Sequence, residues 1–241
     1  MINQAIILAG GRGERLRPLT SDRPKSMVEA RGRPLLDYQL HWLKSQNVLQ
    51  VQLACGYLSE VIEDFCGDGK KWGIKISYSV EPTPLGRGGA LKQALKSLNR
   101  PTEPILCFNG DIVFDLDLKE LVAFHNGCQS TATVVCVPLK SPYGVIDLSE
   151  DCSITRFREK PTLPFWVNAG IYILEPEIFD LLPDTGDHEE TTFPNLCEQK
   201  RLYAFKSKYF WQSVETIKDL KELSTILSMN LPEASKDSGA R

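Results

Sequence analysis

The 241-residue sequence lacks the commonest features that would assign a function at once. It has no Gly-x4-Gly-Lys-Ser/Thr loop, which excludes a P-loop nucleotide site. None of its 7 cysteines stands in a Cys-x-x-Cys pair, so reduced thiols are a better interpretation than disulfides or zinc. It has no long apolar run and no basic leader after Met1, so we expect neither a membrane span nor a signal peptide.

The sequence also lacks a strong charge of either sign. A net charge of −3 gives no general attraction for nucleic acid or for an anionic membrane. Its 42% hydrophobic and 24% charged residues are ordinary values for one globular domain of this length. We therefore expect a cytoplasmic protein without a nucleic-acid or membrane partner, and the composition leaves a homo-oligomer open.

A glycine-rich loop follows the first apolar run, residues 5–8. Gly10, Gly11 and Gly13 let the backbone approach a polyphosphate closely and present N–H groups to it. A dinucleotide-binding fingerprint is excluded because Leu16 stands where its third glycine belongs. Positive charge gathers nearby, at Arg12, Arg15, Arg17, Arg23 and Lys25. The loop therefore indicates phosphate chemistry.

Strand and helix patterns alternate through the first half of the chain. Helical spacing of apolar residues marks 34–46, 58–66 and 88–98, and strand patterns mark 5–8, 51–54, 74–78 and 105–108. This alternation predicts a doubly wound, Rossmann-like α/β fold with a mostly parallel sheet.

Strand patterns dominate the second half, after a helix capped at Asp117. They cover 131–137, 144–148, 154–159 and 167–174, and a closing helix covers 217–229. We expect these strands to add antiparallel members, giving a mixed sheet in a single domain, 1–229, followed by a disordered tail, 230–241.

The loop belongs to a longer string, Leu8-Ala9-Gly10-Gly11-x-Gly13-x-Arg15-Leu16-x-Pro18-Leu19-Thr20 with Pro24-Lys25. This string resembles the signature of the sugar-1-phosphate nucleotidyltransferases, also called NDP-sugar pyrophosphorylases. Asn109-Gly110-Asp111, Glu159-Lys160-Pro161 and Asn168-Ala169-Gly170-Ile171-Tyr172 follow in the family's order. The sequences of these motifs are most similar to those of the mannose- and heptose-1-phosphate guanylyltransferases. The resemblance implies a nucleotide-binding half, about 1–112, and a sugar-binding half, about 113–229.

The reaction implied by the resemblance joins a nucleoside triphosphate to a sugar-1-phosphate and releases pyrophosphate. The attacking phosphate is already largely dianionic at neutral pH, since its second pKa is ~6, so catalysis rests on holding anions together. By the resemblance, Arg15 grips the triphosphate and Lys25 lies near the reacting phosphates. Asp111, after a buried strand, is the candidate ligand of a Mg²⁺ cofactor.

Substrate contacts are also implied by the resemblance. The nucleotide would be bound at Leu8, Gly10, Gly11, Gly13, Glu81, Pro84 and Gly86. The sugar phosphate would be bound at Gly144, Glu159, Lys160 and Asn168. A carboxylate only accepts hydrogen bonds and guanine offers two adjacent donors, so Glu81 favours GTP. Uridylyltransferases also carry a glutamate in this segment, which leaves the backbone as an alternative reader of the base.

Two other functions stay open beside GTP-dependent transfer to mannose- or heptose-1-phosphate. One is uridylyl or thymidylyl transfer to another sugar-1-phosphate, such as that of N-acetylmuramate or glucose. The other is a non-catalytic regulatory subunit that binds a nucleotide sugar, against which intact Arg15 and Lys25 argue.

One family motif is incomplete. Relatives usually carry Trp-x-Asp-x-Gly-Thr near the end, whose Asp joins the metal, but here 211–216 reads Trp-Gln-Ser-Val-Glu-Thr. Ser213 therefore replaces the second carboxylate. Glu215 compensates only if it shares the alternation of Ser213, and we expect it to be a solvated residue at the start of the following helix. Asp111 is then the one anionic ligand, and the metal is expected to enter with the nucleotide.

Overall fold

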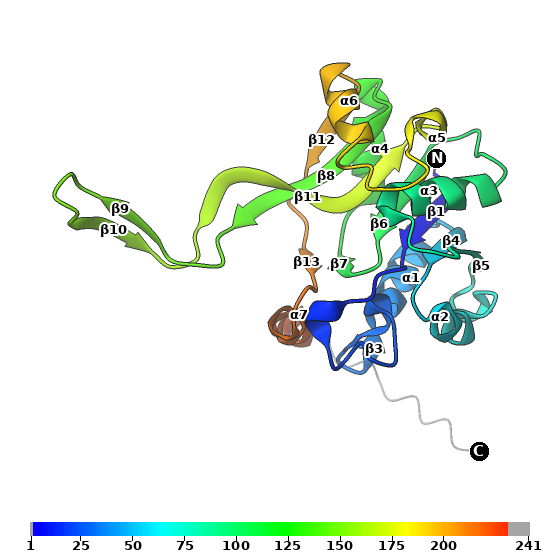
Figure 1. The fold of residues 1–241 in the computed structure, drawn as a ribbon, viewed down its shortest axis with the longest axis horizontal. Coiled ribbons are helices and arrows are strands. Elements are labelled where there is room, and N and C mark those ends of the chain that lie inside the picture. Colours follow the sequence, from blue (N-terminus) through cyan, green and yellow to red (C-terminus); the bar gives the residue numbers. More distant parts are fainter. Residues whose placement is uncertain (1, 231–241) are drawn as a thin grey trace.

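A seven-stranded sheet, in the order β12-β8-β11-β6-β1-β4-β5, forms the centre of the computed structural model, which describes residues 2–230 (Figure 1). Its strands are β1 (Gln4–Leu8), β4 (Gln50–Cys55), β5 (Lys75–Val80), β6 (Ile105–Asn109), β8 (Ala132–Lys140), β11 (Thr162–Leu174) and β12 (Leu202–Lys206). Strands β5, β4, β1 and β6 run parallel, and β11 is antiparallel to both β6 and β8. The predicted mixed α/β sheet is confirmed.

Helices cover both faces of this sheet, because its central strands are apolar on both faces. One layer consists of α1 (Leu35–Ser45), α2 (Ser59–Cys66) and α4 (Leu118–Cys128), and the other of α3 (Gly86–Ser97), α5 (Ile178–Leu181) and α6 (Thr192–Glu198). Ile7 and Phe108 pack on the first side with Leu40. Ile6 lies in the core of the other side with Leu91. Buried parallel strands of this kind read as unbroken apolar runs.

A third apolar cluster joins the last described helix to the segment that follows β1. Helix α7 (Ile217–Asn230) packs through Leu223 against Leu16 and Val28, close to the small pair β2 (Glu29–Ala30) and β3 (Arg33–Pro34). Strand β13 (Trp211–Ser213) pairs antiparallel with β7 (Ile112–Phe114). The segment after β13 therefore passes directly beside Asp111. Short 3₁₀ helices lie at Glu14–Leu16, Lys25–Met27 and Lys70–Trp72.

Strands β9 (Val145–Leu148) and β10 (Ile154–Arg158) form a two-stranded antiparallel arm that extends away from the main sheet (Figure 1). Ile146 faces Phe157 across the arm, and Leu148 faces Ile154. These four side chains are 44–64% exposed. The other face of the arm carries charge. Asp147 faces Arg156 across the two strands and forms an ion pair with Arg158. The arm is thus an amphipathic ribbon.

The helices and strands expected from the sequence are present within a few residues of their predicted ends. Asp117 caps α4 as predicted, since its side chain accepts hydrogen bonds from the N–H groups of Lys119 and Glu120. The sequence did not predict the strands β2, β3, β7, β12 and β13 or the helices α5 and α6. The expected tail, 230–241, lies outside the described residues except for Asn230. Among the helices described, none combines the length and the hydropathy that a membrane crossing requires.

Candidate active site

The carboxyl ends of β1 and β6 lie side by side, with Leu8 in register with Asn109. Open α/β sheets bind ligands at this edge, where the strand order reverses. A cavity of about 440 Å³ opens there. Its lining includes eight residues singled out from the sequence: Leu8, Gly10, Gly11, Lys25, Glu81, Pro84, Gly86 and Asp111. Motifs from four separate segments therefore converge on one cavity.

Glycines in the loops around the cavity allow close backbone packing. Gly13 has a φ of +61°, and a Cβ there would lie 2.9 Å from the Thr20 methyl group. A Cβ on Gly110 would lie 2.9 Å from the carbonyl oxygen of Leu8. Lys25 N–H donates to the Gly11 carbonyl at 3.1 Å and closes the first loop. Gly13 thus allows the tight turn by packing against Thr20 and Lys25, and it does not line the cavity.

Three charged side chains line one wall of the cavity, and a fourth, Arg15, contacts one of them without lining it. The Lys25 ammonium donates to Asp111 Oδ2 at 2.5 Å and lies 2.7 Å from Glu215 Oε1. Arg15 forms an ion pair with the other oxygen of Glu215. Lys25 and Asp111 are the more buried members, with side chains 12% and 21% exposed. Arg15, at 72% exposure, approaches from the rim.

The structure differs from our expectation for Glu215. Its side chain lines the cavity and contacts two cations, so it is not a freely solvated residue of the first helical turn. Ser213, at the end of β13, is not among the residues that line the cavity. The physical reason is that the chain turns after β13, so that the Glu215 side chain points toward Lys25.

The segment expected to read the base enters the cavity beside α3. Glu81 Oε2 accepts a hydrogen bond from Leu85 N–H at 2.9 Å. Its Oε1 lies against Gly10 and Gly56, and a Cβ on Gly56 would come within 2.5 Å of it. Gly86, at a φ of +74°, starts α3. The Glu81 carboxylate is therefore held at the cavity wall by its own segment.

Arg87 and Asp187 line the same cavity and were not singled out from the sequence. Arg87 donates to Asp187 through its backbone N–H at 2.8 Å and through its guanidinium at 2.7 Å. The hydrogen bond from this guanidinium lowers the pKa of the Asp187 carboxyl below its usual range. Arg87 also contacts Glu189 at 2.9 Å. No local pattern marks this contact, because its partners are 100 residues apart.

None of the four residues expected at the sugar phosphate lines the cavity. Gly144, Glu159 and Lys160 stand at the base of the arm, where a Cβ on Gly144 would lie 3.0 Å from Glu159 Oε2. Asn168, on β11, donates to the Tyr172 hydroxyl at 2.9 Å. Gly170 packs against the Asn109 side chain, which is part of the lining. The part of β11 around Gly170 thus borders the cavity.

Two buried polar atoms at the cavity lack a hydrogen-bond partner within residues 2–230. They are Ser26 Oγ and Asn109 Oδ1. Ser26 is only 1% exposed and directly follows Lys25. Buried polar groups are nearly always paired in native proteins, so these atoms point to a ligand that completes their hydrogen bonds.

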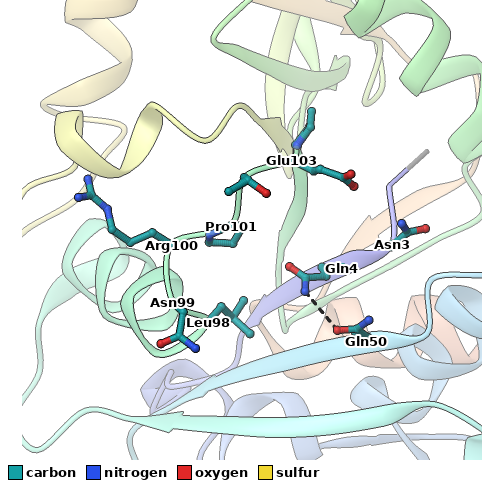
Figure 2. Close-up of a pocket in the computed structure, with 10 residues that line it drawn as sticks. Asn3, Gln4, Gln50, Leu98, Asn99, Arg100, Pro101 and Glu103 are labelled. Atoms are coloured by element: carbon teal, nitrogen blue, oxygen red, sulfur yellow. Dashed lines mark hydrogen bonds between the residues drawn. The ribbon is translucent and has the colours of Figure 1, made fainter.

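A second cavity, of about 350 Å³, opens at the opposite edge of the sheet, near the amino ends of β1 and β4 (Figure 2). Gln4 Nε2 donates to Gln50 Oε1 there at 3.1 Å. Arg100 and Glu103 are its charged lining residues, and Arg100 is paired with Asp180 outside it. Because it lacks a convergent charged group, we assign it no function.

Comparisons with known proteins find similar sequences along nearly the whole chain. The chain is 39% identical over 235 residues to a mannose-1-phosphate guanyltransferase of Eremothecium gossypii and 38% identical to that of Saccharomyces cerevisiae. Each alignment covers 94% of this chain and 65% of the relative. The chain thus spans somewhat less than two thirds of the length of these relatives.

Solved structures agree at the level of the whole domain. The structure of HddC from Yersinia pseudotuberculosis complexed with GMP-PN has a TM-score of 0.74 at 27% identity, covering 94% of this chain and 100% of that one. A Bacillus anthracis structure in complex with sucrose has a TM-score of 0.73 at 22% identity, with coverage of 96% and 97%, and supports the fold alone. A family model described as "Nucleotidyl transferase" matches residues 4–229. The chain therefore belongs to the nucleotidyl transferase family.

Proposed function

We propose that this chain transfers a guanylyl group from GTP to a sugar-1-phosphate of the mannose type. An oxygen of the sugar phosphate bonds to the α-phosphorus of GTP, and the bond from that phosphorus to the β-phosphate oxygen breaks to release pyrophosphate. The observation that carries the proposal is the Lys25–Asp111 pair on the wall of the cavity, in a chain 39% identical to a mannose-1-phosphate guanyltransferase.

The phosphates would bind between the first loop and Lys25. Gly10 and Gly11 line the cavity without a side chain in the way, so their backbone can approach an anion. The Lys25 ammonium supplies positive charge at the same wall, and the Arg15 guanidinium supplies it from the rim. The unpaired hydroxyl of Ser26 supplies a further donor. These groups would stabilise the charge that moves onto the leaving pyrophosphate.

The base would lie against Glu81 and the start of α3. Since Glu81 Oε2 is engaged by Leu85 N–H, Oε1 is the atom left to accept from guanine. One carboxylate oxygen accepts from both neighbouring donors of guanine, N1–H and N2–H₂, whereas uracil sets an acceptor beside its donor. This geometry supports GTP over UTP.

The sugar phosphate would bind between the base of the arm and the first half of β11, which contains Asn168. Lys160 supplies a cation for its phosphate, and Glu159 and Asn168 supply acceptors for its hydroxyl groups. Gly144 lets the backbone pack closely beside Glu159, because a Cβ there would lie 2.9 Å from the Phe157 ring and 3.0 Å from Glu159 Oε2. We propose that residues 113–229 form the sugar-binding half on these grounds.

The donor set of the cavity fits magnesium. Mg²⁺ is typically held by one or two carboxylates together with phosphate oxygens. Asp111 offers such a carboxylate at the reacting end of the cavity. No cluster of three His, Cys, Asp or Glu side chains suited to a metal occurs within residues 2–230, so substrate oxygens must complete the shell. When bound, Mg²⁺ would neutralise phosphate charge and orient the α-phosphate.

A grid of four nucleoside triphosphates against several sugar-1-phosphates, scored by pyrophosphate release, tests the proposal. We expect the highest kcat/KM with GTP and a manno-configured sugar-1-phosphate, and no release without Mg²⁺. A preference for UTP or dTTP would contradict the assignment of guanine. Nucleotide-sugar binding without turnover for every pair would contradict the enzyme and favour a regulatory subunit.

A further inference from the structure

Glu215 occupies a position that the altered motif at 211–216 does not explain. Ser213 removes one carboxylate from this stretch, yet the structure brings another into the cavity two residues later. The Glu215 carboxylate faces Asp111 across the Lys25 ammonium, at 2.7 Å and 2.5 Å from it. Asp111 and Glu215 are called the carboxylate pair below.

The backbone holds Glu215 in place from both sides. Val214 N–H donates to the Asp111 carbonyl at 2.9 Å, and the Val214 side chain is fully buried. Asp219 then accepts from the N–H groups of Glu215 and Thr216, at 3.0 and 2.8 Å, and caps α7. The position of Glu215 beside Asp111 is therefore fixed by the fold and does not depend on the ion pairs of its side chain.

The carboxylate pair already shares one cation. An oxygen of each residue lies within hydrogen-bond distance of the same nitrogen, that of the Lys25 ammonium. Two carboxylates that converge on one cation repel each other when that cation leaves, so another cation is favoured there. A divalent ion satisfies the pair better than a single positive charge.

An independent observation indicates that a ligand belongs at this wall. Ser26 Oγ is buried and has no hydrogen-bond partner in the described part of the chain, and Ser26 lines the same cavity next to Lys25. A phosphate oxygen would accept from it. The wall therefore combines an unsatisfied donor for phosphate with a convergent carboxylate pair for a cation.

We propose that Glu215 replaces the missing second carboxylate and, together with Asp111, binds the divalent cation that accompanies the nucleotide. Lys25 holds the place of that cation while the site is empty. This inference deepens the proposed function and replaces our expectation that Asp111 is the one anionic ligand. It also predicts that Ser213 is dispensable for the metal.

Manganese binding followed by electron paramagnetic resonance tests the inference without turnover. The protein is loaded with a non-hydrolysable GTP analogue, and no sugar phosphate is added. Glu215→Gln should weaken Mn²⁺ binding at least about tenfold, because changing even an outer partner of a metal site costs about that much. Unchanged affinity in Glu215→Gln would overturn the inference.

Ser213→Asp alone keeps the inference testable if Glu215→Gln does not fold. It should leave Mn²⁺ affinity unchanged, because the second ligand is already present. A Ser213→Asp protein that binds Mn²⁺ tenfold more tightly would overturn the inference. Glu14→Gln removes an exposed carboxylate from the neighbouring loop and is the matched control, expected to bind Mn²⁺ as the unaltered protein does.

Lys25→Met, measured without nucleotide, tests whether the ammonium holds the place of the cation. Mn²⁺ binding should tighten when it is removed, and unchanged or weaker binding would overturn the inference. Glu215-dependent Mn²⁺ binding in a protein inactive with every substrate pair would contradict the proposed function and support this inference. Turnover with Glu215-independent Mn²⁺ binding would overturn the inference alone.

Discussion

Replacing Gly56 with alanine should displace Glu81 without straining the backbone. Gly56 does not have a positive φ, so alanine is compatible with its backbone. The new methyl group would lie 2.5 Å from Glu81 Oε1, and ordinary contact begins at 3.4 Å. The flexible carboxylate must therefore move by roughly 1 Å, because it yields more readily than the sheet edge behind it.

The movement should lower the Tm by a few degrees and lower the selectivity for GTP over UTP. Glu81 Oε2 loses its hydrogen bond from Leu85 N–H, and bonds to charged groups contribute about 1.5–3 kcal/mol. We expect the lower value for this half-buried group, or a fall of about 3–6 °C in Tm for a chain of this size. Losing the acceptor for guanine should lower kcat/KM for GTP about tenfold and leave that for UTP nearly unchanged.

Thermal unfolding and pyrophosphate release with GTP and UTP measure the two effects. Glu81→Ala provides the control, because Gly56→Ala should have no further effect on selectivity in that background. An equal loss of activity with GTP and UTP, or a further loss of selectivity in the double variant, would refute the reasoning.

Four other substitutions test separate parts of the molecule. Arg15→Ala should lower kcat about a hundredfold, whereas Lys160→Ala should mainly raise KM for the sugar phosphate; near-normal steady-state kinetics would identify either residue as a surface charge. Burial lowers the pKa of His188 below its ordinary 6.5, so only the unfolded chain gains a proton as pH falls and stability drops below about pH 6.5. His188→Phe should flatten that dependence in urea midpoints at pH 5 and 7, and an unchanged slope would contradict it. Gly127, in α4, has open space around its Cα, so Gly127→Ala should raise unfolding free energy by about 0.5–1 kcal/mol, and a lower Tm would contradict this.

The parallel half of the sheet was predictable because burial on both faces leaves a direct trace in the sequence. Strands β1 and β6 are continuous apolar runs, and the helices between them carry apolar residues at helical spacing. Strand β12 left no such trace, since three of its five residues are exposed and its pairing with β8 defines it. Strand β13 has three residues, too few for an alternation to be recognised.

The candidate site was predictable where its residues belong to local motifs. Lys25 and Asp111 come from two such motifs, and the structure brings them into contact. Glu215 was not predictable, because its contact with Arg15 spans 200 residues and its orientation depends on the cap that Asp219 provides. The contact of Arg87 with Asp187 likewise depends on tertiary structure alone.

A ligand that binds at the base of the amphipathic arm would order the arm as well as contact it. An isolated two-stranded hairpin is marginally stable in water, and the apolar pairs of β9 and β10 remain largely exposed. Amide hydrogens in 145–158 should therefore exchange through local opening, whereas those of β1 exchange only when the whole domain unfolds. A ligand held by Gly144, Glu159 and Lys160 would slow that exchange. The free energy needed to order the arm would then reduce the observed affinity for that ligand.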